Sequence, residues 1–172
     1  MKSQPPEILF IERCVQFLLP GEGIACIVVP DAILGAPGLA YVREWILQQT
    51  RVLASIDMHP DTFQPKNSTQ TSLLVLQRKS ARQIELEKAA GRKQDYTVFM
   101  ALGDHVGHDK RGNTTYVRDG MGNEILRTNR EIVREVHKGA PVLREVETKY
   151  KVVDDNTLEV AQTFRAWLKE QL

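Results

Sequence analysis

His105 and His108 are the first residues whose types and spacing suggest chemistry, because imidazole groups and the carboxylates of the flanking Asp104 and Asp109 are common metal ligands. The pattern is weak evidence for a metal site, since it falls in a loop-like stretch and nothing else nearby completes a ligand set. We therefore expect no metal site in this chain.

Lys110 and Arg111, together with Arg118, make the same stretch locally basic, and its turn signals at 111–113 and 119–123 predict a hairpin. Basic side chains on a turn suit contact with phosphate groups. A solvated turn explains the same residues, so the pattern alone leaves both interpretations open.

A loop between two predicted strands contains Phe63, and the polar stretch 66–71, which includes Lys66 and Asn67, follows it. From the spacing alone, Phe63 is better explained as an anchor of the loop to the core than as a ligand contact. The polar stretch suits contact with a phosphate backbone, and an ordinary solvated loop explains it equally well.

Pro30 and Asp31 come directly after the apolar run 23–29, which reads as a strand. Ligands of open α/β sheets bind outside the carboxyl ends of the strands. Asp31 therefore either lines a pocket at that end or caps a turn, and the sequence favours neither.

The elements that must position these residues alternate between helices and buried strands. Residues 7–19 and 39–49 place apolar side chains at helical spacing, whereas 23–29, 52–58 and 71–77 have the pattern of strands. The first strand is apolar throughout, which predicts burial on both faces. The last two have no helix between them, so we expect antiparallel neighbours in an α/β sheet that is otherwise mostly parallel.

The rest of the chain is more polar. Residues 80–93 predict an exposed helix, 96–102 a strand, 103–124 loops with the basic hairpin, and 158–172 an amphipathic C-terminal helix. Residues 125–152 are highly charged and only weakly patterned, so we assign no element to them.

Composition sets broad bounds on function. The chain has 172 residues, 42% hydrophobic and 26% charged, with a formal net charge of +1, which is typical of a globular protein and excludes a global basic field. Any contact with nucleic acid must therefore be local, or be supplied by other parts of a larger assembly. Cys14 and Cys26 lie in apolar patterns and predict buried thiols in a reducing compartment. Without a signal peptide or an apolar run of about 20 residues, we expect a cytoplasmic protein with no membrane span.

Four blocks, in this order, resemble the modification subunits of type I restriction–modification systems and related N6-adenine DNA methyltransferases. The blocks are FIERCVQFLLPGEGIACIVVPDAILG, YVREWILQQTRVLASIDMHPDTF, TQTSLLVLQRK, and VFMALGDHVGHDKRGN followed later by DDNTLEVAQTFRAWL. No single block is diagnostic, and the order of the four makes the resemblance strong.

The resemblance implies the C-terminal half of a partial Rossmann-like methyltransferase sheet with an antiparallel closing strand in residues 1–95, and a helical and hairpin extension in residues 96–172. It places Phe63 against the flipped target base, which reverses the preference for a core anchor. Pro30 and Asp31, at the carboxyl end of the strand 23–29, are expected to line the same target-base pocket. DNA contacts are expected from Lys66, Asn67, Lys110 and Arg111.

The family binds S-adenosylmethionine at a Gly-rich turn and orients the target amine with an (Asn/Asp)-Pro-Pro-(Tyr/Phe) motif, and both lie upstream of a segment like this one. Gln4-Pro5-Pro6-Glu7 does not match, because Gln4 is the wrong side chain and Glu7 is not aromatic. We therefore expect no catalytic and no cofactor-binding residue here, and no cofactor bound by this chain alone.

The resemblance predicts a fragment of a site-specific adenine methyltransferase, inactive alone. The complete enzyme would use S-adenosylmethionine and DNA, and its partners would be the missing N-terminal segment, a specificity subunit and a restriction subunit. One alternative is a non-catalytic interaction module that assembles with another methylase chain. Another is half of a methylase acting on RNA or protein, against which the block around residues 108–113 argues.

Overall fold

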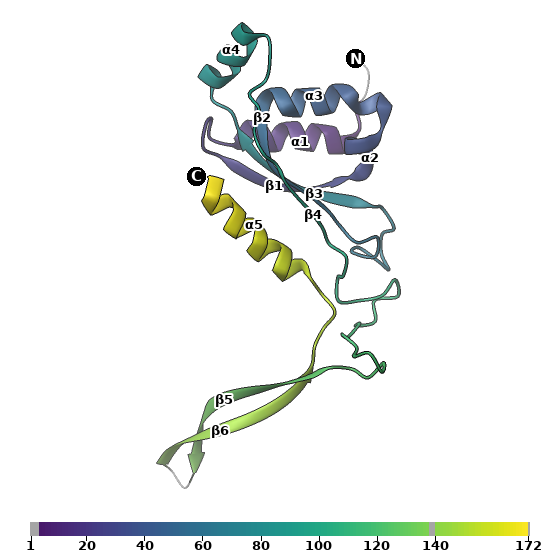
Figure 1. Ribbon diagram of the computed structural model, residues 1–172, viewed down its shortest axis with the longest axis vertical. Coiled ribbons are helices and arrows are strands. Elements are labelled where there is room, and N and C mark those ends of the chain that lie inside the picture. The colour runs from purple at the N-terminus through teal and green to yellow at the C-terminus, as the bar shows by residue number, and fades with distance from the viewer. Residues whose placement is uncertain (1–3, 138–139, 172) are drawn as a thin grey trace.

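The chain forms a four-stranded mixed sheet that is flanked by helices, and a long two-stranded hairpin extends from it (Figure 1). The computed structural model describes residues 4–137 and 140–171. Its elements are α1 (Pro6–Phe17), β1 (Ile24–Pro30), α2 (Asp31–Gly35), the 3₁₀ helix η1 (Pro37–Leu39), α3 (Ala40–Gln49), β2 (Thr50–Asp57), β3 (Thr71–Arg78), α4 (Ala81–Ala90), β4 (Phe99–Leu102), β5 (Leu126–His137), β6 (Ala140–Lys151) and α5 (Thr157–Gln171).

The strand order in the sheet is β1-β3-β2-β4, and β3 runs antiparallel to both of its neighbours. The prediction that strands 52–58 and 71–77 pair in antiparallel fashion is therefore confirmed. Since β1 and β2 both oppose β3, they run parallel to each other, and β4 is parallel to β2. The carboxyl ends of β1, β2 and β4 consequently lie together along one edge of the sheet. This edge runs across the strand ends and is distinct from the lateral edge, which is formed by an outer strand.

Helices α1 and α3 cover one face of this sheet (Figure 1). Ile11 and Val15 of α1, and Val42 and Ile46 of α3, are four residues apart and all buried, as expected for helices with one apolar stripe. They pack with buried side chains of the strands, including Val29, Leu74 and Leu76.

Local signals fix the ends of α4. The Ser80 hydroxyl accepts a hydrogen bond from the Gln83 backbone N–H at 3.2 Å, and the Gln83 side chain accepts one from the Ser80 N–H at 2.8 Å. This reciprocal pair satisfies two backbone donors that a helix start leaves free. The helix ends at Gly91, whose φ of 65° suits glycine.

No helix in residues 4–137 and 140–171 is long and apolar enough to cross a membrane.

The prediction that strand 23–29 is buried on both faces is wrong. Ile24 is 51% exposed and Val28 46% exposed, and Cys26, predicted to be buried, is also exposed. In the described part of the chain β1 pairs with β3 alone, so it lies at the edge of the sheet. Helix α5 packs against β2, β3 and β4 on the second face and leaves the same face of β1 uncovered.

The structure also adds an element where none was assigned. Strands β5 and β6 have 12 residues each and pair in antiparallel register from Leu126–Lys151 to His137–Ala140, forming a hairpin that extends away from the sheet (Figure 1). Its strands mix charged and apolar residues on both faces, so the alternation that marks a half-buried strand is missing. The hairpin predicted within 103–124 consists of two tight turns, around Asp109–Asn113 and Asp119–Asn123.

Three aromatic rings attach α5 to the sheet. The ring centroids of Phe99 and Phe164 are 5.3 Å apart, those of Phe99 and Trp167 5.8 Å, and those of Phe164 and Trp167 6.0 Å. Phe164 and Leu168 also contact the small core of Leu53, Ala54 and Val75. These distances suit the tilted and offset arrangements that aromatic pairs prefer.

We predict that Phe164→Ala lowers the free energy of unfolding by about 1–2 kcal/mol, because a half-buried ring loses its contacts with the sheet. Guanidinium unfolding followed by tryptophan fluorescence would measure the change. Leu158→Ala is the matched control, since Leu158 lies on the same helix and is 68% exposed. Equal effects of the two substitutions would show that the aromatic cluster does not hold α5.

Candidate functional site at the carboxyl ends of the strands

All of the predicted site residues follow the strands that end at one edge of the sheet. Pro30 and Asp31 stand at the end of β1, the loop with Phe63 follows β2, and the basic turn follows β4. The register confirms the shared edge, because Pro30 pairs with Thr71 at the start of β3, and Asp57 pairs with both Ser72 and Leu102. This is where open α/β sheets bind ligands.

Asp31 is held at this edge by the central strand β3. Its Oδ1 accepts a hydrogen bond of 2.8 Å from the hydroxyl of Ser72, which is 5% exposed, and its backbone N–H donates to the Gln70 carbonyl at 3.1 Å. The side chain makes no helix-capping hydrogen bond at the start of α2. A carboxylate fixed in this way presents acceptor oxygens at the sheet edge.

A second acidic residue at this edge, Asp57, was not predicted from the sequence. Asp57 ends β2, and its Oδ1 lies 3.4 Å from the Gln70 side-chain nitrogen, which also donates to the Met58 carbonyl at 3.0 Å. The signal was present in the sequence, since Asp57 terminates its strand just as Asp31 follows β1. The role of Ser72 and Gln70 depends on the strand register and could not be read from spacing.

The loop of residues 58–70 holds Phe63 at its surface. The ring belongs to neither buried apolar cluster of the described chain, and the residue is 41% exposed. The loop is instead shaped by its own hydrogen bonds: the Thr62 hydroxyl donates to the His59 carbonyl at 2.6 Å, and the Asn67 N–H donates to the Phe63 carbonyl at 2.9 Å. Phe63 is therefore a partly exposed aromatic residue at this edge of the sheet.

The basic turn after β4 is organised by one carboxylate. Asp109 accepts hydrogen bonds from the backbone N–H groups of Arg111 at 2.8 Å and Asn113 at 2.9 Å, and from the Asn113 side-chain amide at 3.0 Å. These bonds, led by the one from the Asn113 side chain, hold the pKa of Asp109 below its usual value. The side chains of Lys110 and Arg111 are exposed at the tip of this turn.

Close glycine contacts bring the two loops together. Gly112 has a φ of +84°, and a Cβ atom there would lie 3.4 Å from the Pro65 ring. Gly103 donates its N–H to the Asp57 carbonyl at 2.7 Å, which ties the segment after β4 to the end of β2. The turn with Lys110 therefore lies against the loop that contains Phe63.

The two histidines of this region have separate partners. His105 Nδ1 is 3.2 Å from Asp154 Oδ2, whereas His108 Nδ1 is 3.0 Å from the Asp109 carbonyl oxygen. Within residues 4–137 and 140–171, no group of three or more His, Cys, Asp or Glu side chains is arranged to hold a metal ion.

We predict that Asp109→Ala loosens the basic turn, because the N–H groups of Arg111 and Asn113 lose their acceptor. Faster amide exchange at these two positions should report the change. Asp119→Ala is the matched control: Asp119 accepts from the N–H groups of Met121 and Asn123 in the second turn, so exchange should rise there instead. Unchanged exchange at residues 111 and 113 in the first variant would contradict the assignment.

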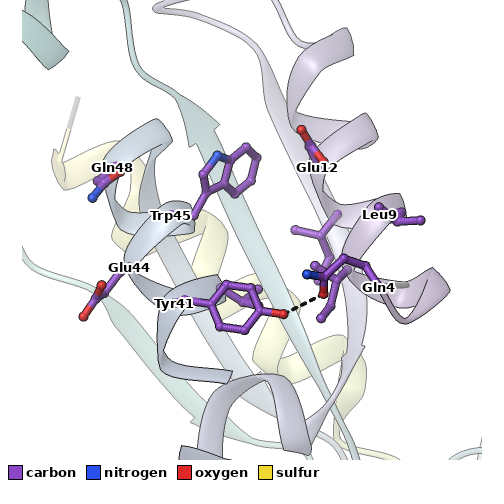
Figure 2. Close-up of a pocket in the computed structure, with 10 residues that line it drawn as sticks. Gln4, Leu9, Glu12, Tyr41, Glu44, Trp45 and Gln48 are labelled. Carbon is purple, nitrogen blue, oxygen red and sulfur yellow. Dashed lines mark hydrogen bonds between the residues drawn. The ribbon is translucent and has the colours of Figure 1, made fainter. Parts of the chain in front are cut away.

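A separate groove of about 380 Å³ lies between α1 and α3 (Figure 2). Figure 2 shows Tyr41 pointing toward Gln4, whose Oε1 accepts a hydrogen bond of 2.7 Å from the tyrosine hydroxyl. The Gln4-Pro5-Pro6-Glu7 segment thus forms the start of α1, with Pro6 as the first helical residue. Glu12 and Glu44 are the charged residues that line the groove, and none of the predicted site residues does.

Comparison with known proteins gives limited matches. The chain matches no protein-family model and no curated protein. A protein of Listeria monocytogenes assigned to the class I S-adenosylmethionine-dependent methyltransferases has a similar structure, with 23% identity over 59% of this chain and 28% of that chain and a TM-score of 0.44. A chain from a structure of type I restriction–modification system assembly is 27% identical over 46% of this chain and 17% of that chain, with a TM-score of 0.41. This chain thus spans less than a third of either protein.

Proposed function

We propose that the chain is the C-terminal part of the catalytic domain of an N6-adenine DNA methyltransferase of the type I modification-subunit kind. The observation that supports this most is the convergence at one sheet edge of an exposed aromatic ring, a fixed carboxylate and a basic turn. In the proposal, Phe63, Pro30 and Asp31 line the target-base pocket. Lys66, Asn67, Lys110 and Arg111 contact the DNA backbone beside it.

The chemistry of adenine methylation explains why these side chains suit the task. The exocyclic amine is reached only when the base is flipped out of the duplex, at a cost of a few kcal/mol. Stacking on an aromatic side chain offsets about 1–3 kcal/mol of that cost. The exposed side chain of Phe63 offers such a face, and Asp31 offers acceptor oxygens at the same edge of the sheet.

The turn after β1 does not fit a site for S-adenosylmethionine. The turn from β1 to α2 is formed by Pro30 and Asp31, with no glycine to let a backbone approach a cofactor closely. In the proposal, the cofactor site and the (Asn/Asp)-Pro-Pro-(Tyr/Phe) motif come from another segment of the enzyme. A specificity subunit would read the sequence, and a restriction subunit would complete the system.

Reconstitution tests the proposal directly. The chain is co-expressed with a methyltransferase segment that contains the cofactor turn and the catalytic motif, and transfer of labelled methyl groups to adenine in DNA is measured. Activity should require both pieces, with neither active alone. Full activity of the other segment without this chain would refute the proposal.

The exposed β5–β6 hairpin favours a second candidate, a non-catalytic module that assembles with a methylase chain that is complete in itself. Its prediction differs at one residue. In this case, replacing Phe63 would leave methylation unchanged, whereas removing the hairpin would abolish assembly.

A further inference from the structure

The tip half of the β5–β6 hairpin exposes several apolar side chains on one face. Opposite residues of an antiparallel pair lie on the same face, and so do alternate residues along each strand. The register therefore places Ile132 and Val136 of β5 on one face with Pro141 and Leu143 of β6. Ile132 is 73%, Val136 75% and Leu143 71% exposed, and we call this surface the tip face.

The hairpin has no apolar core of its own. Every residue of β5 and every residue of β6 except Val146 is exposed, and in the described chain neither strand pairs with the sheet. Two-stranded hairpins are at best marginally stable alone in water. Exposed apolar side chains gathered on one face of such an arm indicate an interaction surface.

The charges on the tip face indicate what covers it. Arg134 pairs in register with Leu143, and Glu145 pairs with Ile132, so one cation and one anion lie in neighbouring rows among the apolar side chains. Neither takes part in an ion pair within the described residues, whereas Arg130 and Glu147, in the next row, are 2.7 Å apart. A face with apolar groups and one charge of each sign is complementary to itself.

We infer that the tip face binds the tip face of a second copy of this chain, forming a two-fold symmetric dimer. Two-fold contacts between identical patches are the commonest arrangement among soluble homo-oligomers. Stacking the tip face on itself about a two-fold axis through these rows sets Arg134 of each copy beside the partner's Glu145. The apolar residues of both hairpins are then removed from water together.

Nucleic acid fits this surface less well than a second copy. A two-stranded ribbon has the size to enter the major groove. The acidic side chains Glu131, Glu135, Glu145 and Glu147 nevertheless lie among the basic ones on both strands, and the tip face itself is largely apolar. A phosphate backbone would meet both repulsion and apolar surface there.

Sedimentation equilibrium on the full chain provides the first test. Leu143→Asp should weaken dimerisation by about a hundredfold or more, because the symmetric contact loses an apolar side chain twice and gains two buried charges. Met121→Asp is the matched control: Met121 is 88% exposed in the turn near the root of the hairpin and should have no effect. Circular dichroism would verify that both variants fold.

Charge exchange provides a test that only a contact between copies can pass. Arg134→Glu and Glu145→Arg each place like charges together in the dimer, and each should weaken dimerisation about tenfold. An equimolar mixture of the two variants restores both opposite-charge contacts between copies while leaving each chain unchanged. The mixture should therefore form heterodimers with nearly the affinity of the parent.

Three results would overturn the inference. One is a parent chain that stays monomeric up to its solubility limit. If substitutions in the hairpin then lower the affinity of this monomer for DNA, the surface binds nucleic acid instead. Another is an association that Leu143→Asp leaves intact and that Val28→Lys, on the exposed face of β1, abolishes. The third is failure of the mixed charge variants to associate better than either variant alone.

Discussion

Replacing Phe63 by alanine in the reconstituted methyltransferase should lower turnover about five- to a hundredfold while leaving cofactor affinity nearly intact. The reason is the loss of base stacking, worth about 1–3 kcal/mol. The residue is 41% exposed and lies outside both buried clusters of the described chain, so removal of its ring should leave the fold in place. Fluorescence of 2-aminopurine at the target position would report base flipping directly.

Phe17→Ala is the matched control for this substitution. Phe17 is an exposed phenylalanine at the end of α1, 78% exposed, and it follows no strand end of the candidate site. The control should flip and methylate like the parent. If Phe63→Ala does the same, the ring has no part in the target-base pocket. If instead the variant unfolds, the interpretation of Phe63 as a core anchor is correct.

The sequence was sufficient to predict which residues lie at the carboxyl ends of the strands, but not which hydrogen bonds they make there. Strand patterns at 23–29 and 52–58 were enough to expect Asp31 and the loop with Phe63 at carboxyl ends, and the order of strands was enough to expect antiparallel pairing. The partners of Asp31 could not be predicted, because Ser72 reaches it only through the register of β1 against β3.

Exposure was the harder property to predict. Residues 23–29 are apolar throughout, and burial of an apolar run on both faces requires neighbours that a single strand pattern does not specify. Since α5 packs on β2, β3 and β4 and leaves the same face of β1 uncovered, Ile24 and Val28 are exposed. In the hairpin the difficulty is reversed, because Arg130, Ile132 and Arg134 share one face and erase the alternation. Both differences arise where no other element covers a face of a strand.

The ion pair between Lys79 and Glu87 should make the largest charge-dependent contribution to stability. Lys79 Nζ lies 2.7 Å from Glu87 Oε2 and donates to the Leu47 carbonyl at 2.8 Å, and its side chain is only 5% exposed. Glu87 is less buried, with 15% of its side chain exposed. The pair fastens α4 to the sheet, because Lys79 follows directly after β3.

Glu87→Gln should lower the free energy of unfolding by about 2–3 kcal/mol, since it leaves the buried ammonium group without its counter-charge. Lys79→Met should cost less, because methionine fills similar space without a charge and Glu87 can turn toward solvent. Guanidinium unfolding at neutral pH would compare the two variants. A larger loss from Lys79→Met than from Glu87→Gln would contradict this asymmetry.

The same pair predicts how stability changes with acid. Burial alone would raise the pKa of Glu87, but the hydrogen bonds from Lys79 and from the Gln94 backbone outweigh it and hold the pKa below its usual value. A folded-state pKa below the unfolded value gives stabilisation that is fully present above the ordinary glutamate pKa, about 4.3, and is lost as the pH falls through the lower folded value. Lys79→Met should therefore flatten this acid limb of the stability profile. An acid limb as steep as that of the parent would show that other carboxylates, such as Asp109, account for it.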